Sequence, residues 1–591
     1  MIGKILIFIL PFISIIFGAA TFKYEKRVNS HPEKLWRGFQ KFAHSDETKG
    51  LACITCTSVV DTLQKMIENG KTDEEVEDFL IKTCKELQIE QDYVCNQIIH
   101  QFADEAIFVL SNAIVTPAEI CGAFIADCGT SENPLNDLWP FTVPGNKPAV
   151  KPWPIVKNPQ SKLRVLHLTD IHIDRNYTVG AEANCGYKKL INTDAFCCRN
   201  YPGDTEESNV RYIRKGGSVK AGYWGAPYKC DIPYRTFINA MEHISKNDKF
   251  DYIIVTGDLE SHDIWDYTRQ RTMTNVLNIT AVLNEYFPKT PIYQATGNHE
   301  GVPMDSMGAH TMPEYKKRGP QWLFNTFAQA WKRDLPADTQ SGIKYRASYS
   351  IKPFSGLKLI SLNTVYCSQM NLYNYLNQTD PDGTLAWLSQ ELLDSESKGE
   401  KVHIISHIPP GVTYCLKGWS FNFYKLVERF ENTIAFLGMG HTHKDHFEVY
   451  YDSANVKNRP INVNWIAPSL TTFADSNPSY RVYEFDGNYQ GSSFTVLEAE
   501  TYYTDISKAT ESSPPVWELE YKFTKEYGLS DLSPTSFNTL ISKLNSDETL
   551  FARFYTNYHR KATSCDSLCK DKMICSLKSA RSYDSSTFCS Q

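Results

Sequence analysis

Residues 163–172 read Leu-Arg-Val-Leu-His-Leu-Thr-Asp-Ile-His, a short apolar run that ends in an aspartate and a histidine. An apolar run of this length is typical of a strand that is buried on both faces. In open α/β sheets, ligands bind just beyond the carboxyl ends of the strands. The stretch therefore predicts a buried strand that delivers Asp170 and His172 to a binding site.

The same design recurs four times along the chain, with strands predicted at 252–256, 292–296, 402–406 and 433–439. The polar residues that follow these strands are Asp258, Asn298, His299, Glu300, His407, His441 and His443. Each feature alone is ordinary, because Gly-Asp is a common turn and a single histidine at a strand end is more often structural than a ligand. Together they supply the aspartate, asparagine and histidine groups that suit two divalent ions.

This ordered set resembles the signature of calcineurin-like metallophosphoesterases, over residues 161–480. The resemblance implies an α/β domain built as a two-sheet sandwich flanked by helices. It also implies three ligands for a first metal (Asp170, His172, His443), three for a second (Asn298, His407, His441) and a bridging Asp258. Four imidazoles favour zinc over magnesium, which prefers oxygen, so two Zn²⁺ per chain are expected. In purple acid phosphatases a tyrosine three residues after the bridging aspartate binds ferric iron, whereas this chain has Ser261 there.

The candidate catalytic residues are two further histidines, His299 and His262. The metallophosphoesterase resemblance implies that His299, next to the ligand Asn298, contacts the phosphoryl or leaving-group oxygen and acts as general acid. His262, in Gly-Asp-Leu-Glu-Ser-His-Asp, is the second candidate. A structural role remains the alternative for both, and more so for His262. Two-metal sites stabilise an in-line displacement, so the implied reaction is phosphodiester hydrolysis by a metal-held water.

The N-terminus predicts entry into the secretory pathway. Residues 1–20 combine a charged start, an apolar run from Ile5 to Phe17 and a small-residue end, as in a cleaved signal peptide. A membrane anchor is the alternative, but the run is too short to span a bilayer and no later apolar run reaches the length of a transmembrane segment. Three sequons, at Asn176, Asn278 and Asn377, are predicted glycosylation sites. We therefore expect a secreted or lysosomal protein whose 16 cysteines form disulfides.

Residues 49–132 form a separate block with six cysteines and apolar residues at helical spacing. Six cysteines permit fifteen pairings. The block resembles a saposin B-type domain, with all six cysteines in the family's order, and so is expected to be all-α. The pairings that this resemblance implies are Cys53–Cys128, Cys56–Cys121 and Cys84–Cys95. A zinc site at Cys53 and Cys56 is the competing interpretation, but no second Cys-x2-Cys or histidine pair completes it.

The remaining segments are a linker and a tail. Residues 133–160 contain seven prolines in twenty-eight residues, which predicts a semi-rigid extended linker. Residues 481–591 are expected to be a mainly helical, disulfide-bearing region, with helix-like apolar spacing at 517–527 and 536–558.

Saposin-like block, proline-rich linker, metallophosphoesterase domain and cysteine-bearing tail, in this order, resemble the acid sphingomyelinase family. The resemblance implies cleavage of sphingomyelin, in membranes or lipoproteins, to ceramide and phosphocholine. It also implies five more disulfides: Cys185–Cys197, Cys198–Cys230, Cys367–Cys415, Cys565–Cys569 and Cys575–Cys589. Two alternatives stay open, a related phosphodiesterase that acts on nucleotides and a lipid-binding protein with an inactive phosphoesterase scaffold. All seven metal positions carry competent residues, which disfavours the second.

Charge narrows the range of partners. The chain has 61 Lys and Arg against 68 Asp and Glu and no long basic cluster, which argues against nucleic acid as the main partner. Between Cys53 and Cys128 there are fourteen acidic residues and four lysines, a net charge of −10 that repels anionic lipid at neutral pH. Near about pH 5 these carboxylates are partly protonated, and most of the eleven histidines that are not predicted ligands should be charged. Contact with anionic lipid surfaces at acidic pH is therefore predicted, although a solvated helix face is the simpler interpretation of any single carboxylate.

Overall fold

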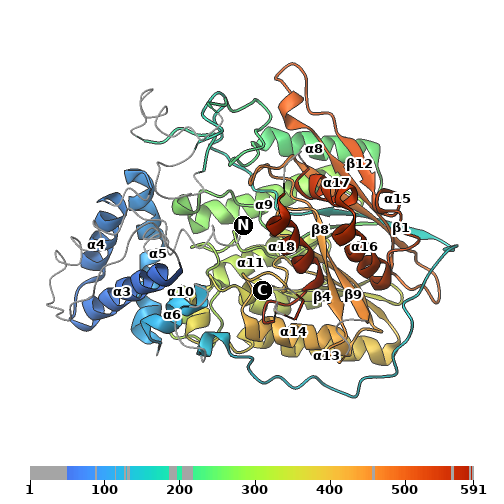
Figure 1. Cartoon of the computed structure of the whole chain (residues 1–591), viewed down its shortest axis with the longest axis horizontal. Helices are drawn as coiled ribbons and strands as arrows, with labels where there is room; N and C mark the ends of the chain where they lie inside the picture. Colours follow the sequence, from blue (N-terminus) through green and yellow to red (C-terminus); the bar gives the residue numbers. More distant parts are fainter. Residues whose placement is uncertain are drawn as a thin grey trace.

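The computed structural model describes residues 49–588, except for 87–89, 114, 125–127, 129–132, 186–195, 203–216, 455–458, 561–564 and 585–586. The predicted signal peptide lies outside these ranges. Figure 1 shows a small helical domain (blue) at one side of a larger α/β body. No helix among the described residues is long and apolar enough to cross a membrane.

The N-terminal domain is all-helical, as the saposin resemblance implied. Its helices are α3 (Lys49–Glu68), α4 (Asp73–Glu86), α5 (Asp92–Asn112) and α6 (Pro117–Phe124). The three expected disulfides are present, Cys53–Cys128, Cys56–Cys121 and Cys84–Cys95. The first two join α3 to the chain at and after α6, and the third joins α4 to α5. These bonds hold together a domain that is too small to bury a large core.

The first sheet of the α/β body has the strand order β12-β11-β10-β1-β2-β3. Its strands are β1 (Lys162–Leu168), β2 (Tyr252–Val255), β3 (Ile292–Gln294), β10 (Ser479–Asp486), β11 (Val496–Tyr503) and β12 (Glu518–Lys522). Strands β1, β2 and β3 are parallel neighbours, and β10 pairs antiparallel with β1. The carboxyl ends of β1 to β3 therefore meet at one edge of this sheet.

The second sheet has the order β4-β5-β6-β7-β9-β8. Its strands are β4 (Tyr349–Phe354), β5 (Leu357–Ser361), β6 (Lys401–Ile405), β7 (Ile434–Met439), β8 (His446–Tyr451) and β9 (Pro460–Ile466). Strands β5, β6, β7 and β9 are parallel. One apolar core contains buried residues of both sheets, among them Leu166 and Leu359, so the sheets face each other as the predicted sandwich.

Helices cover the two outer faces. Helices α8 (Tyr234–Asn247), α9 (Arg269–Tyr286) and α11 (Gln321–Ala330) pack in the same core as the first sheet. Helices α13 (Thr384–Lys398) and α14 (Lys417–Arg429) pack in a second core with residues of β6 and β7. The α/β sandwich flanked by helices agrees with the metallophosphoesterase resemblance.

The C-terminal region is helical only in its later part. Helices α15 (Phe523–Tyr527), α16 (Pro534–Ser546), α17 (Glu548–His559) and α18 (Ser567–Lys578) fit the prediction. The boundary expected at 480 instead falls inside β10, and the helical spacing read at 517–527 is wrong for 518–522, which is β12. Strand β12 pairs with β11, and the two extend the first sheet beyond β10. A five-residue strand is too short for its period to be separated from a helical one.

Most of the predicted linker is irregular in structure, and it is hydrogen-bonded to the α/β body. Residues 137–161 form no helix or strand, and Lys151 and Ala149 of this segment are hydrogen-bonded to Asn432.

Four further expected disulfides are present, Cys185–Cys197, Cys198–Cys230, Cys367–Cys415 and Cys565–Cys569, whereas Cys575–Cys589 involves a residue outside the described ranges. Of the predicted glycosylation sites, Asn176 and Asn377 are exposed and Asn278 is half-buried. Glycosylation itself stays a prediction.

Candidate metal centre

The seven predicted metal ligands meet where the carboxyl ends of the two sheets adjoin. They follow five strands, with Asp170 and His172 after β1, Asp258 after β2, Asn298 after β3, His407 after β6, and His441 and His443 after β7. Two groups have ligand atoms within 4.8 Å of one another, Asp170 with His172 and His443, and Asp258 with His407 and His441. All seven are buried or nearly so, and together they form one compact centre.

The first group is a tight set of nitrogen and oxygen atoms. The Nε2 atom of His443 lies 3.2 Å from Nε2 of His172 and 3.3 Å from Oδ1 of Asp170. The Oδ2 atom of Asp258 lies 3.5 Å from the same His172 nitrogen. The arrangement is the one expected of ligands that share a cation.

The second group is built around the same aspartate. The Nε2 atom of His407 lies 3.0 Å from both Oδ2 of Asp258 and Oδ1 of Asn298. The Nδ1 atom of His441 lies 3.0 Å from that Asn298 oxygen. One oxygen of Asp258 thus neighbours a histidine of each group, which is the place of a bridging ligand.

Hydrogen bonds to the backbone set the orientation of two ligand histidines. The Nδ1–H of His172 donates to the carbonyl oxygen of Glu260 at 2.5 Å, and the Nδ1–H of His407 donates to that of Thr256 at 2.6 Å. Each bond leaves the lone pair on Nε2, the nitrogen that faces the other ligands. Such outer contacts are typical of metal-binding imidazoles.

The backbone of the centre is held in unusual conformations. Five of the seven ligands have positive φ, at Asp170 (49°), His172 (39°), Asp258 (59°), His441 (71°) and His443 (61°). Left-handed backbone at a non-glycine residue costs free energy and clusters at functional sites. Gly297 allows its loop to lie against Asp258, since a Cβ at this glycine would be 2.2 Å from Oδ1 of Asp258.

The electrostatics of the centre favour a cation. Burial alone would raise the pKa of Asp258, but the neighbouring His407 and His299 hold it well below its usual range. Burial lowers the pKa of His407, and Asp258 more than offsets this, raising it to about 9. Without a metal the fold therefore keeps a positive charge beside Asp258. A divalent ion would supply that charge directly, so the residues present fit the metals that the sequence implied.

His299 lies beside the centre with one ring nitrogen engaged. The hydroxyl of Tyr267 donates to the carbonyl oxygen of Ser261, so the Nδ1–H of His299 must donate to the Tyr267 oxygen, 2.7 Å away. The remaining nitrogen, Nε2, has no partner among the described residues. Burial lowers the pKa of His299 to about 3.

His262 is held by an aspartate that was not among the predicted site residues. Its backbone N–H and its Nδ1–H both donate to the carboxylate of Asp231, at 2.7 and 2.9 Å. Its ring stacks on Phe473 at a centroid distance of 3.8 Å and lies 4.0 Å from the ring of His172. Because His262 belongs to the wall of the centre, its place agrees with the second candidate role.

Two further residues, Glu300 and Tyr267, support the centre in roles that the sequence did not reveal. Glu300 accepts hydrogen bonds from the backbone N–H groups of Gly297, Asp258 and Leu259. Its position directly after His299 was visible in the sequence, but its role as a clamp between two loops was not. Nothing in the sequence around Asp231 or Tyr267 marks either residue, since each acts on a histidine about thirty residues away.

The expectation that most of the eleven histidines outside the predicted ligands are charged near pH 5 is wrong for the buried ones. Burial lowers the pKa of His167 and His559 to about 3 and that of His403 and His446 to about 4. Removal from water disfavours the imidazolium form, so these side chains stay neutral at pH 5. These buried histidines therefore add little positive charge in mild acid.

Comparisons of the sequence with known families and proteins agree with this architecture. Family models match at residues 163–445 (calcineurin-like phosphoesterase), 459–590 (acid sphingomyelin phosphodiesterase C-terminal region) and 51–88 (saposin-like type B, region 1). Sphingomyelin phosphodiesterase 2 of Caenorhabditis elegans is 48% identical over 562 residues, which is 94% of this chain and 91% of that protein. Sphingomyelin phosphodiesterase of Homo sapiens is 36% identical over 95% of this chain and 86% of its own length. A solved dimetal phosphatase from Danio rerio aligns at a TM-score of 0.34 and 11% identity, covering 62% of this chain and all of that one.

Proposed function

The chain belongs to the acid sphingomyelin phosphodiesterase family of hydrolases, and we propose that it cleaves sphingomyelin to ceramide and phosphocholine with two zinc ions bound at the centre described above. The observation that carries the proposal is the pair of ligand groups that share Asp258. Relatives that match nearly the whole chain are named sphingomyelin phosphodiesterases, which supports the substrate.

The donor set supports zinc as the metal. Four imidazoles, two carboxylates and one amide oxygen make up the predicted ligands, a combination that suits zinc better than magnesium. Ser261 stands where an iron-binding tyrosine would stand, and its hydroxyl donates to Asp263. When bound, two such ions lower the pKa of water and neutralise charge on the phosphoryl oxygens.

The protein's own side chains supply a proton for the leaving group. We assign this task to Nε2 of His299, because Nδ1 is committed to Tyr267, and we assign His262 a supporting role. The low pKa of His299 in the free protein keeps that nitrogen unprotonated in mild acid. A phosphodiester anion placed beside the ring would raise this pKa, so that the proton is taken up together with the substrate.

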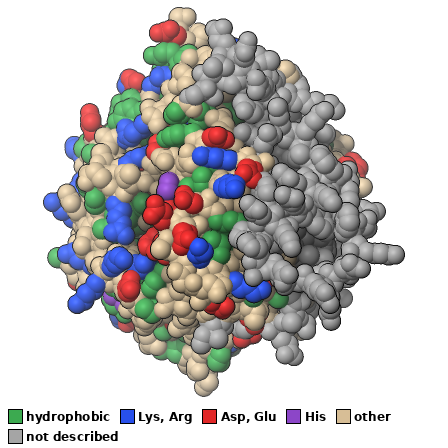
Figure 2. Space-filling model, turned by 90° about the vertical axis from the view of Figure 1, so that its left-hand side faces the viewer, with side chains coloured by type: hydrophobic (Ala, Val, Ile, Leu, Met, Phe, Trp, Pro, Cys, Tyr) green, Lys and Arg blue, Asp and Glu red, His purple; other side chains and the backbone are tan. Residues whose placement is uncertain are grey.

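The N-terminal domain favours a membrane lipid over a soluble nucleotide. Acid sphingomyelinase-like phosphodiesterase 3b of Homo sapiens matches only 61% of this chain, at 29% identity, whereas the two sphingomyelin phosphodiesterases named above match over 94% and 95% of it. Helix α4 exposes Asp73, Glu74, Glu75 and Asp78. Figure 2 shows Asp and Glu side chains near the centre of this side of the molecule, with Lys and Arg side chains elsewhere on it. We propose that this domain contacts anionic lipid surfaces at acidic pH and that the protein acts in a lysosome or outside the cell.

The test uses purified protein and vesicles that contain labelled sphingomyelin. We expect release of phosphocholine, loss of release on chelation, and recovery when zinc is added back. A nucleotide diester serves as the competing substrate. Faster hydrolysis of the nucleotide than of sphingomyelin would contradict the proposed substrate, and full activity in metal-free protein would contradict the metal centre.

A further inference from the structure

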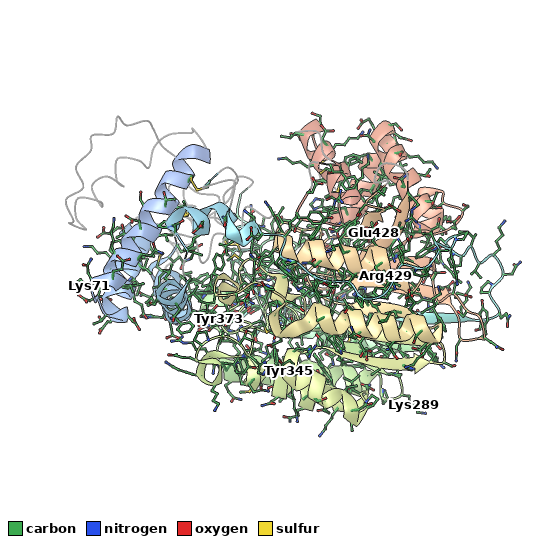
Figure 3. All side chains as sticks on the ribbon, turned by 90° about the horizontal axis from the view of Figure 1, so that it is seen from below. Lys71, Lys289, Tyr345, Tyr373, Glu428 and Arg429 are labelled. Atoms are coloured by element: carbon green, nitrogen blue, oxygen red, sulfur yellow. A yellow bond between two sulfur atoms is a disulfide. The ribbon has the colours of Figure 1, made fainter. Side chains whose placement is uncertain are left out.

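Helix α5 of the N-terminal domain carries a buried carboxyl group that faces the catalytic domain. Glu105 is only 5% exposed, and its Oε2 atom accepts a hydrogen bond from the hydroxyl of Ser306 at 2.5 Å. Figure 3 places Tyr373 at the junction of the two domains, and its ring meets that of Phe108, one turn further along α5. A carboxyl group is expensive to bury, so its retention at this position calls for a specific reason.

Ser306 ends a compact loop that folds back on a metal ligand. The backbone N–H groups of Gly301 and Asp305 both donate to the carbonyl oxygen of Asn298, at 3.3 and 2.9 Å. The side-chain amide of Asn298 donates in turn to the Asp305 carboxylate at 3.4 Å. The loop has no space for a side chain at Gly301, where a Cβ would lie 2.7 Å from the backbone nitrogen of Ser306. A shift of Ser306 is therefore transmitted to Asn298.

The same helix also supports His299. One apolar cluster contains Ile98 and Phe102 of α5 together with Trp265, Tyr267 and Met304 of the catalytic domain. Tyr267 is the hydrogen-bond partner of Nδ1 of His299. Helix α5 thus contacts the loop that supports Asn298. It also packs against Tyr267, which supports His299, the next residue in the chain.

We propose that Glu105 is a positioning residue of the active site, which holds the 301–306 loop through Ser306 and thereby fixes Asn298 for metal binding. The inference rests on the proposed function and deepens it, because it makes the N-terminal domain part of the catalytic apparatus as well as a lipid contact. Burial raises the pKa of Glu105 to about 7, which agrees with a carboxyl group enclosed by the two domains.

The neighbouring residue provides a matched control. Asp104 lies on the same helix, but its side chain is 67% exposed, and its hydrogen bonds and ion pair across the interface go to Arg318 of the catalytic domain. Asp104→Asn therefore weakens the same interface without reaching the metal centre. Glu105→Gln keeps an oxygen that accepts from Ser306, whereas Glu105→Ala does not.

The experiment uses the full-length zinc-loaded protein and a soluble chromogenic phosphocholine diester, so that lipid binding plays no part. For Glu105→Ala we expect kcat to fall about tenfold with KM nearly unchanged, together with weaker binding of one of the two zinc ions in a metal titration. We expect Glu105→Gln to recover most of kcat and Asp104→Asn to match the wild type. Wild-type kcat and zinc affinity in folded Glu105→Ala would overturn the inference.

A second variant covers the case in which Glu105→Ala does not fold. Ser306→Ala removes the same hydrogen bond from the catalytic side and leaves the N-terminal domain intact. An equal loss of kcat and of zinc affinity supports the inference, and wild-type values for both overturn it. If the wild type fails to cleave any phosphocholine diester, the proposed function is wrong, yet the zinc titration still decides whether Glu105 acts on the metal site.

Discussion

The N-terminal domain and the metal-bearing edge of the α/β body achieve rigidity by different means. The N-terminal domain depends on three disulfides across four helices, since so small a domain buries little apolar surface. At the metal-bearing edge, five of the predicted ligands have positive φ and follow strands of two packed sheets. Disulfides are present there too, Cys198–Cys230 in the connection that follows β1 and Cys367–Cys415 between the connections that follow β5 and β6. A large core can therefore position strained catalytic residues, while a cross-linked helical domain can present charge to a membrane. Helix α5 is where the two designs meet.

The bridging aspartate should give the largest effect and tests the metal-bearing edge alone. Asp258→Asn is expected to lower activity on soluble and vesicle substrates alike by roughly a hundredfold or more and to lower bound zinc, since one oxygen serves both ligand groups. The measurement is kcat together with metal content per chain. Asp338→Asn, at an exposed position, is the control, and full zinc content with full turnover in Asp258→Asn would refute the shared-ligand assignment.

The second-largest effect should come from Asp231, which orients His262 at the metal-bearing edge. Asp231→Ala should lower kcat by about ten- to a hundredfold with zinc content unchanged, because the imidazole loses the partner that sets its orientation. Asp231→Asn, which keeps an acceptor for the Nδ1–H, should lose less. The measurements are steady-state kinetics and the zinc content of each variant. An equal loss of kcat in Asp231→Ala and Asp231→Asn would argue that the charge of Asp231 matters, and not its orientation of His262.

Each region contains a buried glutamate that links its stability to pH. Burial raises the pKa of Glu90 in the N-terminal domain and of Glu448 in β8 to about 8. A carboxyl group with a raised folded pKa stabilises the protein below its unfolded pKa of about 4.3, and this contribution is lost as pH rises through the folded value. As pH rises from 5 to 8, these two groups should therefore lower the midpoint of thermal unfolding, so that Glu90→Gln and Glu448→Gln lose less stability over this range than the wild type does. A pH dependence that is the same in the two variants as in the wild type would contradict the burial of these groups as acids.

The smallest effect should come from the acidic face of the N-terminal domain. Neutralising the exposed Glu74 and Asp78 of α4 is expected to raise activity on anionic vesicles at pH 7 by about twofold and to leave soluble-substrate kinetics unchanged. Neutralising Asp338 and the exposed Glu511, outside that domain, controls for net charge. The same gain in both pairs would show that the total charge, and no particular face, governs contact with anionic lipid.

Local pattern was enough to predict which side chains gather at the catalytic edge, whereas their proposed roles as metal ligands came from the family resemblance. Asp170, Asp258 and Asn298 each come directly after a short apolar strand, and strands of one parallel sheet must end at the same edge. Seven predicted disulfides were likewise confirmed, because cysteine order follows the family resemblance. The strand at 518–522 was missed, since its pairing with β11, and not its own short pattern, makes it a strand.

The sequence by itself determined which residue types reach the catalytic edge, the division into helical and α/β parts, and the cysteine framework, because each is encoded in neighbouring residues or in a fixed order along the chain. Only the tertiary structure decided which side chains support those ligands. Glu105 meets Ser306 across 201 residues, and Asp231 meets His262 across 31. Contacts at such separations depend on how whole elements pack, and burial in that packing also decided which histidines stay neutral in acid.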